Sequence, residues 1–121
     1  MKPDRAFRAL ADPARLRLLR LLRHGALCVG DLVTALRVAQ PAASRHLATL
    51  SAAGLVVGER RGRWSFYRLA PAEDAFQRRL LAAIHAAGSP AARRDEANLR
   101  ALLRAGGCCP GHPKRRKHGR A

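Results

Sequence analysis

The spacing of apolar residues predicts that the chain begins with two short helices. Between residues 13 and 23, leucines recur at about every third position and arginines fill many of the positions between them. This spacing gives an α-helix one apolar face and one basic face. Asp12 and Pro13 are typical of the first residues of a helix, and Gly25 is typical of the position after its end. A shorter helix is expected over residues 3–11.

Two further helices follow in the pattern. Residues 29–36 form a short apolar-patterned helix that opens near Cys28, and residues 37–40 are expected to turn the chain. Between residues 41 and 54, the apolar residues fall at positions i, i+4 and i+7, which predicts a helix with one buried stripe. The other face presents hydrogen-bonding side chains, namely Gln40, Ser44, Arg45 and Thr49.

The second half of the chain changes to a strand pattern and then returns to helices. Residues 55–60 and 64–69 are rich in β-branched and aromatic residues, as strands are, and residues 61–63 predict a tight turn with a basic tip. Helices are expected over residues 71–87, with acidic residues in the first turn, and over residues 91–105.

This order of elements describes a winged helix-turn-helix. The expected fold is mainly α (α+β), with a two-stranded β-hairpin as the wing, and one domain is the usual outcome for 121 residues. The domain is expected to cover residues 1–105. Residues 106–121 begin with two glycines and end in a basic run, so a flexible tail is expected there.

The charge of the chain points to a polyanionic partner. Lys and Arg outnumber Asp and Glu by 24 to 8, which gives a net charge of +16. Five of the basic residues lie between Lys114 and Arg120, so the preceding residues still carry +11. Nucleic acid is the first expectation, and an anionic membrane surface is the second.

The predicted duplex contacts lie on the fourth helix and on the tip of the hairpin. They comprise Gln40, Ser44, Arg45, His46, Thr49, Arg61 and Arg63. A helix fits the major groove, where Gln40, Ser44 and Arg45 are expected to read base edges. His46 and the two hairpin arginines are expected to contact phosphates or the neighbouring groove. A helix-packing role is the alternative for His46.

Other classes of protein find little support. No run of about 18 apolar residues is present, and the first residues, MKPDRAFRAL, lack the apolar region of a signal peptide. A cytoplasmic protein without a membrane partner is therefore expected. No phosphate-binding glycine loop, zinc-protease motif or pair of catalytic carboxylates is visible, so an enzyme is not expected.

Four segments, within about residues 6–69, resemble the ArsR/SmtB family of bacterial metal-responsive repressors. They read LADPARLRLLRLL, LCVGDL, QPAASRHLATLSAAGLV and RRGRWSFYRL. The resemblance implies a homodimer whose first and last helices form the interface. It also implies that the dimer binds an inverted-repeat operator in double-stranded DNA and releases it when a metal or metalloid binds.

Two inducer sites implied by the resemblance do not match this chain. The arsenic-responsive branch carries Cys-x-Cys with a third cysteine three residues later, whereas Cys28 is followed here by Gly30 and Val33 at those positions. The zinc and nickel branch carries carboxylates and paired histidines on the dimer helix, where this chain offers two carboxylates and the single His85. Neither site is expected to operate.

The remaining candidate is the adjacent pair Cys108 and Cys109. Consecutive Cα atoms are about 3.8 Å apart, too close for a relaxed disulfide between the two residues. Members that resemble this sequence place such a pair after the last helix and bind trivalent arsenic or antimony, which soft thiolates select. Arsenite or methylarsenite is therefore the expected inducer, with Cys28 as a third ligand if it can reach.

Other roles for the cysteines stay open. Cys28 could be a small buried hydrophobic residue, and His112 could join the cysteine pair to bind zinc or copper. The cysteines could also sense oxidation or reactive sulfur. A constitutive DNA-binding protein with incidental cysteines is the last alternative, and it would be insensitive to arsenicals.

Overall fold

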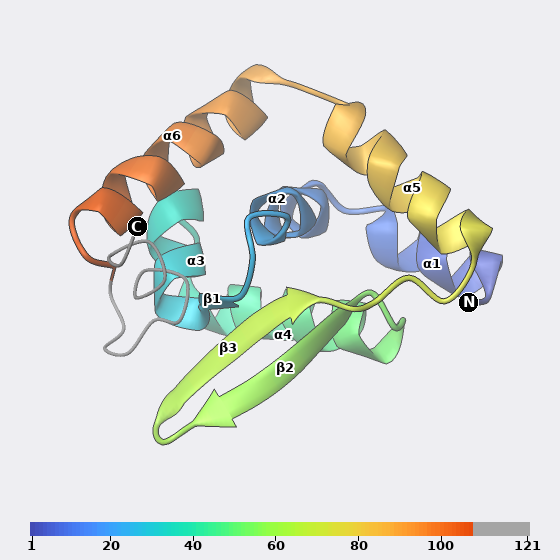
Figure 1. Ribbon diagram of the computed structural model, residues 1–121, viewed down its shortest axis with the longest axis horizontal. Coiled ribbons are helices and arrows are strands. Elements are labelled where there is room, and N and C mark those ends of the chain that lie inside the picture. The colour runs from blue at the N-terminus through green and yellow to red at the C-terminus, as the bar shows by residue number, and fades with distance from the viewer. Residues whose placement is uncertain (108–121) are drawn as a thin grey trace.

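The computed structural model describes residues 1–107, and residues 108–121 lie outside its described part. In chain order the elements are α1 (Pro3–Leu10), α2 (Pro13–Leu22), β1 (Leu27–Cys28), α3 (Val29–Leu36), α4 (Gln40–Ala52), β2 (Val56–Arg61), β3 (Trp64–Leu69), α5 (Ala75–Ala86) and α6 (Pro90–Arg104). Figure 1 shows α5 and α6 arching over α2, with the β2–β3 hairpin projecting from the helices. The mainly α winged helix-turn-helix is confirmed.

The start of α2 follows the expected capping chemistry. The carboxylate of Asp12 accepts hydrogen bonds from the backbone N–H groups of Ala14 at 2.8 Å and Arg15 at 3.3 Å. These bonds satisfy donors that the first turn of a helix otherwise leaves without partners. Leucines on more than one side of α2 are buried. The helix therefore lies in the middle of the fold.

Replacing Asp12 with alanine is expected to lower the free energy of unfolding by about 1 kcal/mol, because the N-cap is lost. Burial raises the pKa of Asp12, but the hydrogen bonds from Ala14 and Arg15 outweigh it and hold the pKa below its ordinary value. The stabilisation from ionisation is therefore present above the ordinary pKa of 3.8 and is lost as the pH falls through the lowered pKa.

Urea unfolding at neutral pH and at about pH 3 measures both effects of this cap. Asp12→Asn is the matched control, because it keeps an acceptor oxygen and should cost less than Asp12→Ala at neutral pH. Equal costs for the two variants would mean that the oxygen of Asp12 does not cap α2.

The helix-turn-helix consists of α3 and α4. Arg37 ends α3 in the left-handed conformation, with φ of 58°, and the chain turns there into α4. Helix α4 begins at Gln40, one residue earlier than expected, and Pro41 is tolerated in its first turn. The predicted stripe of α4 is confirmed, since Ala43, Leu47 and Leu50 are buried.

The wing is an antiparallel hairpin with one additional short strand. Strands β2 and β3 pair from Val56 with Leu69 to Arg61 with Trp64, and Gly62 in the turn has φ of 62°. Strand β1 adds to the free edge of β3, with Cys28 opposite Phe66. The sequence pattern did not reveal β1, because two residues show no periodicity. Its pairing fixes Cys28 at the base of the wing.

The last two helices begin at different residues from those expected. Helix α5 begins at Ala75 rather than near Pro71, because the carboxylate of Asp74 accepts the N–H of Gln77 at 2.9 Å and acts as the N-cap. Helix α6 begins at Pro90, and the hydroxyl oxygen of Ser89 accepts the N–H of Ala92 at 3.1 Å. The two acidic residues expected in the first turn of α5 therefore precede the helix: Asp74 is its N-cap, and Glu73 is the residue before the N-cap.

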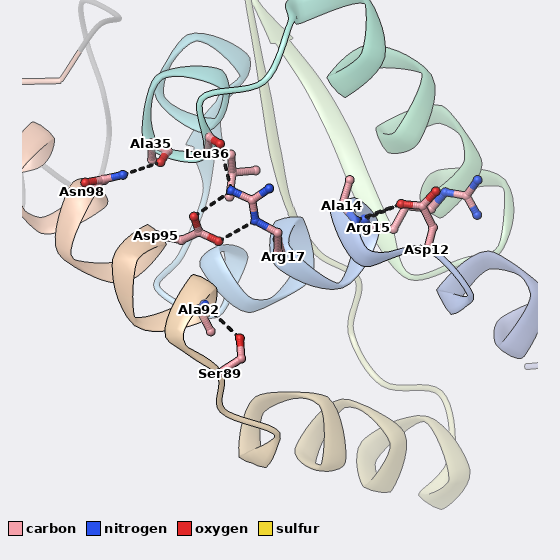
Figure 2. A network of polar contacts seen from close by, with 10 residues as sticks. All are labelled: Asp12, Ala14, Arg15, Arg17, Ala35, Leu36, Ser89, Ala92, Asp95 and Asn98. Atoms are coloured by element: carbon pink, nitrogen blue, oxygen red, sulfur yellow. Dashed lines mark hydrogen bonds and ion pairs between the residues drawn. The ribbon is translucent and has the colours of Figure 1, made fainter.

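Helix α6 lies along α3, the first helix of the helix-turn-helix. Arg17 of α2 donates to both carboxylate oxygens of Asp95, at 2.8 and 2.9 Å, and to the backbone oxygen of Leu36 at 2.8 Å. The side chain of Asn98 donates to the backbone oxygen of Ala35 at 2.9 Å (Figure 2). These bonds join α6 and α2 to the carboxyl end of α3.

The chain after α6 reaches the opposite end of α3. A Cβ atom built on Gly107 would lie 3.4 Å from both carboxylate oxygens of Asp31, in the first turn of α3. Because Asn98 lies beside Ala35 and Gly107 beside Asp31, the two helices run in opposite directions along each other. None of the helices in residues 1–107 is long and apolar enough to cross a membrane.

Candidate nucleic-acid interface

The exposed face of α4 carries four of the predicted DNA contacts. Gln40 and Ser44 lie four residues apart, as do Arg45 and Thr49, so they form two neighbouring rows on the helix, and all four are exposed. The hydroxyl of Thr49 donates to the backbone oxygen of Arg45 at 3.1 Å. The oxygen of that hydroxyl can still accept a bond from a base or a backbone group.

His46 lies on a different side of the same helix. Its ring is half-buried, and Nδ1 accepts a hydrogen bond from Nε of Arg15 at 3.2 Å. Arg15 also donates to the backbone oxygen of Ala9 at 2.9 Å, so the three residues connect α4 with α2 and α1. This geometry supports the helix-packing alternative for His46, and a phosphate contact by His46 stays a prediction.

The two hairpin arginines have different surroundings. Nε of Arg61 lies 3.2 Å from a carboxylate oxygen of Glu59, and its guanidinium lies 5.1 Å from the centre of the Phe66 ring. These contacts hold Arg61 against the wing. Arg63, on the other side of Gly62, is exposed at the tip. It can reach a duplex without first leaving an ion pair or a ring contact such as those of Arg61.

The wing and the start of α4 enclose a groove of about 230 Å³. Gln40, Ser44 and Arg63, which are three of the predicted contacts, line it together with Trp64 and Cys28. The sulfur of Cys28 accepts the backbone N–H of Asp31 at 3.4 Å, and the Cys28 residue is fully buried. A cysteine that was singled out for metal binding therefore adjoins the residues expected to read DNA.

A second cleft shows residues that the sequence analysis missed. Arg5 and Arg8 of α1, with Arg15 and Thr49, line a cleft of about 480 Å³ on the other side of α4. Arg5 and Arg8 are exposed and lie three residues apart, on one flank of a helix whose alanines are buried. That one-sided pattern was visible in the sequence, but the position of α1 beside α4 was not.

The opposite flank of α1 is apolar. Phe7 is 56% exposed and meets Phe76 of α5 edge to face, with the ring centres 5.8 Å apart. A large exposed aromatic side chain is typical of a contact surface between proteins. The expected dimer surface therefore has a candidate on α1 and α5, whereas α6, the last helix, is packed on α3 and α2.

Histidine, cysteine and acidic side chains form no metal site in residues 1–107, since no group of three or more of them is arranged to hold an ion there. Cys28 lies within this part. Cys108 and Cys109, the other predicted ligands, lie outside the described residues.

Comparison with known proteins identifies the family. The family model described as bacterial regulatory protein, arsR family, matches residues 12–57. A solved homodimeric winged helix-turn-helix DNA-binding domain from Mycobacterium bovis, described as a possible ArsR-family transcriptional regulator, is 34% identical, with a TM-score of 0.59, and the match covers 69% of this chain and 74% of that one. The chain belongs to the ArsR family.

The curated relatives of this ArsR-family protein include both ArsR and SmtB regulators. "Arsenic resistance transcriptional regulator ArsR1" of Pseudomonas putida is 46% identical over 59% of this chain and 56% of its own length. "HTH-type transcriptional repressor SmtB" of Mycobacterium tuberculosis is 54% identical over 52% of this chain and 47% of its own. The chain thus spans about half the length of these curated relatives.

Proposed function

We propose that this ArsR-family protein is a homodimeric transcriptional repressor that binds an inverted-repeat operator in double-stranded DNA. The observation that carries the proposal is that exposed residues of α4 line two clefts. Thr49 shares one cleft with Arg5 and Arg8 of α1, and Gln40 and Ser44 share the other with Arg63 at the tip of the wing. A two-fold dimer through the apolar flank of α1 would present two such surfaces to two half-sites.

The residues of this surface divide by the part of the duplex that they contact. Gln40, Ser44 and Arg45 read base edges, because their side chains can donate to or accept from the major-groove pattern. Thr49 adds a contact on the same face. Arg5, Arg8 and Arg63 contact phosphates on either side, since arginine pairs with phosphate oxygens without regard to sequence.

The double variant Arg5→Gln plus Arg8→Gln is expected to weaken binding to every duplex. The slope of log affinity against log salt should fall by about 1 for each phosphate contact removed. Fluorescence anisotropy over a salt series measures this slope, with a duplex selected by the protein from a randomised pool. The matched control is Arg93→Gln plus Arg94→Gln, which removes two exposed charges from α6 and should leave the slope nearly unchanged.

Gln40→Ala is the complementary variant. It should lose about 1–3 kcal/mol of discrimination between the selected duplex and one changed at the contacted base pair, with the salt slope retained. If neither the slope nor the discrimination changes in these variants, the surface around α4 is not the DNA-binding surface.

We further propose that trivalent arsenic or antimony is the inducer and that Cys108, Cys109 and Cys28 bind it. Support comes from the position of Gly107 beside Asp31, because the N–H of Asp31 is bonded to the sulfur of Cys28 and Cys108 is the next residue after Gly107. Each residue extends the chain by at most about 3.8 Å. The tail therefore leaves the domain near the buried cysteine.

The chemistry of the proposed site is an exchange of oxygen for sulfur. In the reduced protein, arsenous acid and three thiols form three As–S bonds and release three molecules of water. Soft thiolate ligands suit such a centre, and the basic residues near Cys108 and Cys109 favour the thiolate form. Binding at Cys108 and Cys109, directly after α6, is proposed to bias the dimer towards weaker DNA affinity, and a third bond to Cys28 would add a change beside Gln40 and Ser44 in the groove.

Cys28→Ser separates the three-sulfur site from a two-sulfur site. Arsenite, with three exchangeable hydroxyls, should bind the variant about tenfold or more weakly, whereas methylarsenite, which has two, should bind as it does to the wild type. Ultraviolet charge-transfer absorbance of As–S bonds reports both titrations. Equal affinity of arsenite for the two proteins would exclude Cys28 as a ligand.

The position of Gly107 also supports a second candidate function, a sensor of oxidants or reactive sulfur. Cys28 is disulfide-bonded in this structure. In such a sensor, a disulfide between Cys28 and a tail cysteine would form when the protein is oxidised and open when it is reduced. Release of the operator by hydrogen peroxide or a polysulfide, with no effect of either arsenical, would favour this function over the first.

A further inference from the structure

A cavity of about 470 Å³ lies away from the DNA-reading surface, between α2, the end of α5 and the start of α6. Its volume is within the usual range for small-molecule sites. Leu16, Ile84 and several alanines give it a mostly apolar wall. Arg17 and Arg20, one helical turn apart on α2, are the charged side chains among its lining residues in the described part of the chain.

The two arginines differ in how their charge is balanced. Arg17 is paired with the buried carboxylate of Asp95. Arg20 donates through Nη1 to the backbone oxygens of Ile84 at 2.7 Å, His85 at 3.0 Å and Ala87 at 2.6 Å, all of them uncharged. Within residues 1–107, its Nε is buried without an acceptor, and none of the ion pairs involves it. The cavity wall therefore contains a positive charge that no carboxylate of the described residues pairs with directly.

The start of α6 adds to this positive character. Ser89 and Ala91, in the cap and first turn of the helix, line the cavity, and the amino end of a helix carries a partial positive charge. The neighbouring His85 lies among charges of both signs, since its pKa is lowered first by burial and then by the charges of Arg23 and Arg20, while Glu96 raises it. An anion is the ligand that compensates Arg20 and the start of α6.

We propose that this cavity is a binding site for a small carboxylic acid with an apolar body, such as a medium-chain fatty acid. The carboxylate pairs with the guanidinium of Arg20, and the hydrocarbon lies against Leu16 and Ile84. The guanidinium of the partly buried Arg20 has only uncharged acceptors among the described residues, so the carboxylate would supply an anionic partner while the hydrocarbon leaves water. The cavity is separate from the proposed arsenical site, because it lies at the start of α6 and Gly107 lies after its end.

Octanoate is a suitable probe, and octanamide is its uncharged counterpart of similar size. Titrations of the full chain, followed by calorimetry and by amide NMR shifts, should show octanoate binding at the cavity and octanamide binding about tenfold or more weakly. Arg20→Met should remove this preference for the charged probe. Because Arg20 also caps α5, a second variant is needed that leaves this contact intact.

Ala83→Leu provides the second variant, because Ala83 is an exposed residue at the wall of the cavity and leucine would fill the space. Octanoate binding should weaken about tenfold or more, with the melting temperature and DNA affinity retained. The matched control is Ala82→Leu, which changes an exposed neighbour on α5 outside the cavity lining and should bind octanoate as the wild type does.

Three results would overturn the proposal. One is equal binding of octanoate and octanamide. Another is unchanged octanoate binding in Ala83→Leu, which would place the carboxylate elsewhere on this basic chain. The third is no octanoate binding together with weaker dimerisation of Ala83→Leu in sedimentation, which would show that a second copy covers the cavity.

Discussion

The double variant Cys108→Ser plus Cys109→Ser is expected to retain its DNA affinity and lose its release by arsenite and methylarsenite. If arsenical binding lowers operator affinity about 100-fold in the wild type, the coupling free energy is about 2.7 kcal/mol, and the variant should lose all of it. Both cysteines follow the last residue of α6, Arg104, in the sequence. The melting temperature of the reduced protein should therefore be unchanged.

Fluorescence anisotropy of the protein–duplex complex measures this release during titration with arsenite, methylarsenite and zinc. The wild type should respond to both arsenicals. Cys28→Ser should respond to methylarsenite as the wild type does and need about tenfold or more arsenite for the same release. Because linkage is reciprocal, the duplex should weaken arsenical binding to the wild type by the same factor. Normal release of the double variant by arsenite would show that the proposed sulfur site is wrong.

Titration with zinc distinguishes the proposed arsenical site from the alternative zinc or copper site, in which His112 joins the two cysteines. If Cys108, Cys109 and His112 bound zinc, release by zinc would depend on His112 as well as on the two cysteines. Release by zinc but by neither arsenical would therefore mean that the inducer is a transition metal such as zinc. Release by no ligand or oxidant would leave a constitutive DNA-binding protein.

The local signals in the sequence were sufficient for most of the fold. Asp12 caps α2 as expected, and the stripe through Leu47 fixed the buried side of α4 and hence its exposed side. Both signals act within a few residues, where capping and helical periodicity decide the outcome. The start of α5 was misplaced because Pro71 and Asp74 are both acceptable at a helix start, and the side chain of Asp74 makes the capping bond.

Contacts between distant segments account for what the sequence did not show. Strand β1 exists because β3 offers an edge for Leu27 and Cys28, and nothing in those two residues indicates the pairing. The contribution of Arg5 and Arg8 depends on α1 lying beside Thr49, more than forty residues away. Arg61, predicted as a DNA contact, is partly engaged by Glu59 and Phe66. The position of Gly107 beside Asp31 is also a contact between distant segments that the sequence did not show.

Arg17 and Asp95 make the contact between distant residues that should matter most for stability. Asp95→Asn is expected to lower the free energy of unfolding by about 3 kcal/mol, near the lower end of the 3–5 kcal/mol found when one partner of a buried ion pair is removed. The lower end applies because the Asp95 side chain is 4% exposed but that of Arg17 is 29% exposed. The hydrogen bonds that Arg17 donates to Asp95 raise the pKa of Arg17 although burial lowers it. Arg17 stays charged in the variant as well, because a guanidinium is not deprotonated in proteins.

Urea unfolding gives this free energy, and Asp4→Asn is the matched control. Asp4 is an exposed residue of α1, so the same change in charge there should alter stability by less than about 0.5 kcal/mol. The double variant Arg17→Met plus Asp95→Leu should recover much of the loss, because it removes both charges from the buried site. A cost for Asp95→Asn no larger than that of Asp4→Asn would mean that the pair does not hold α6 in place.

The same ion pair should connect the stability of α6 with DNA binding. Nη2 of Arg17 bonds both Asp95 and the backbone oxygen of Leu36, at the end of α3 from which the chain turns into α4. When Asp95 is replaced, Arg17 loses the partner that orients it towards Leu36, and α6 loses a connection to the helix-turn-helix. Operator affinity should therefore fall in Asp95→Asn at temperatures where the protein is still folded, whereas Asp4→Asn should leave it unchanged.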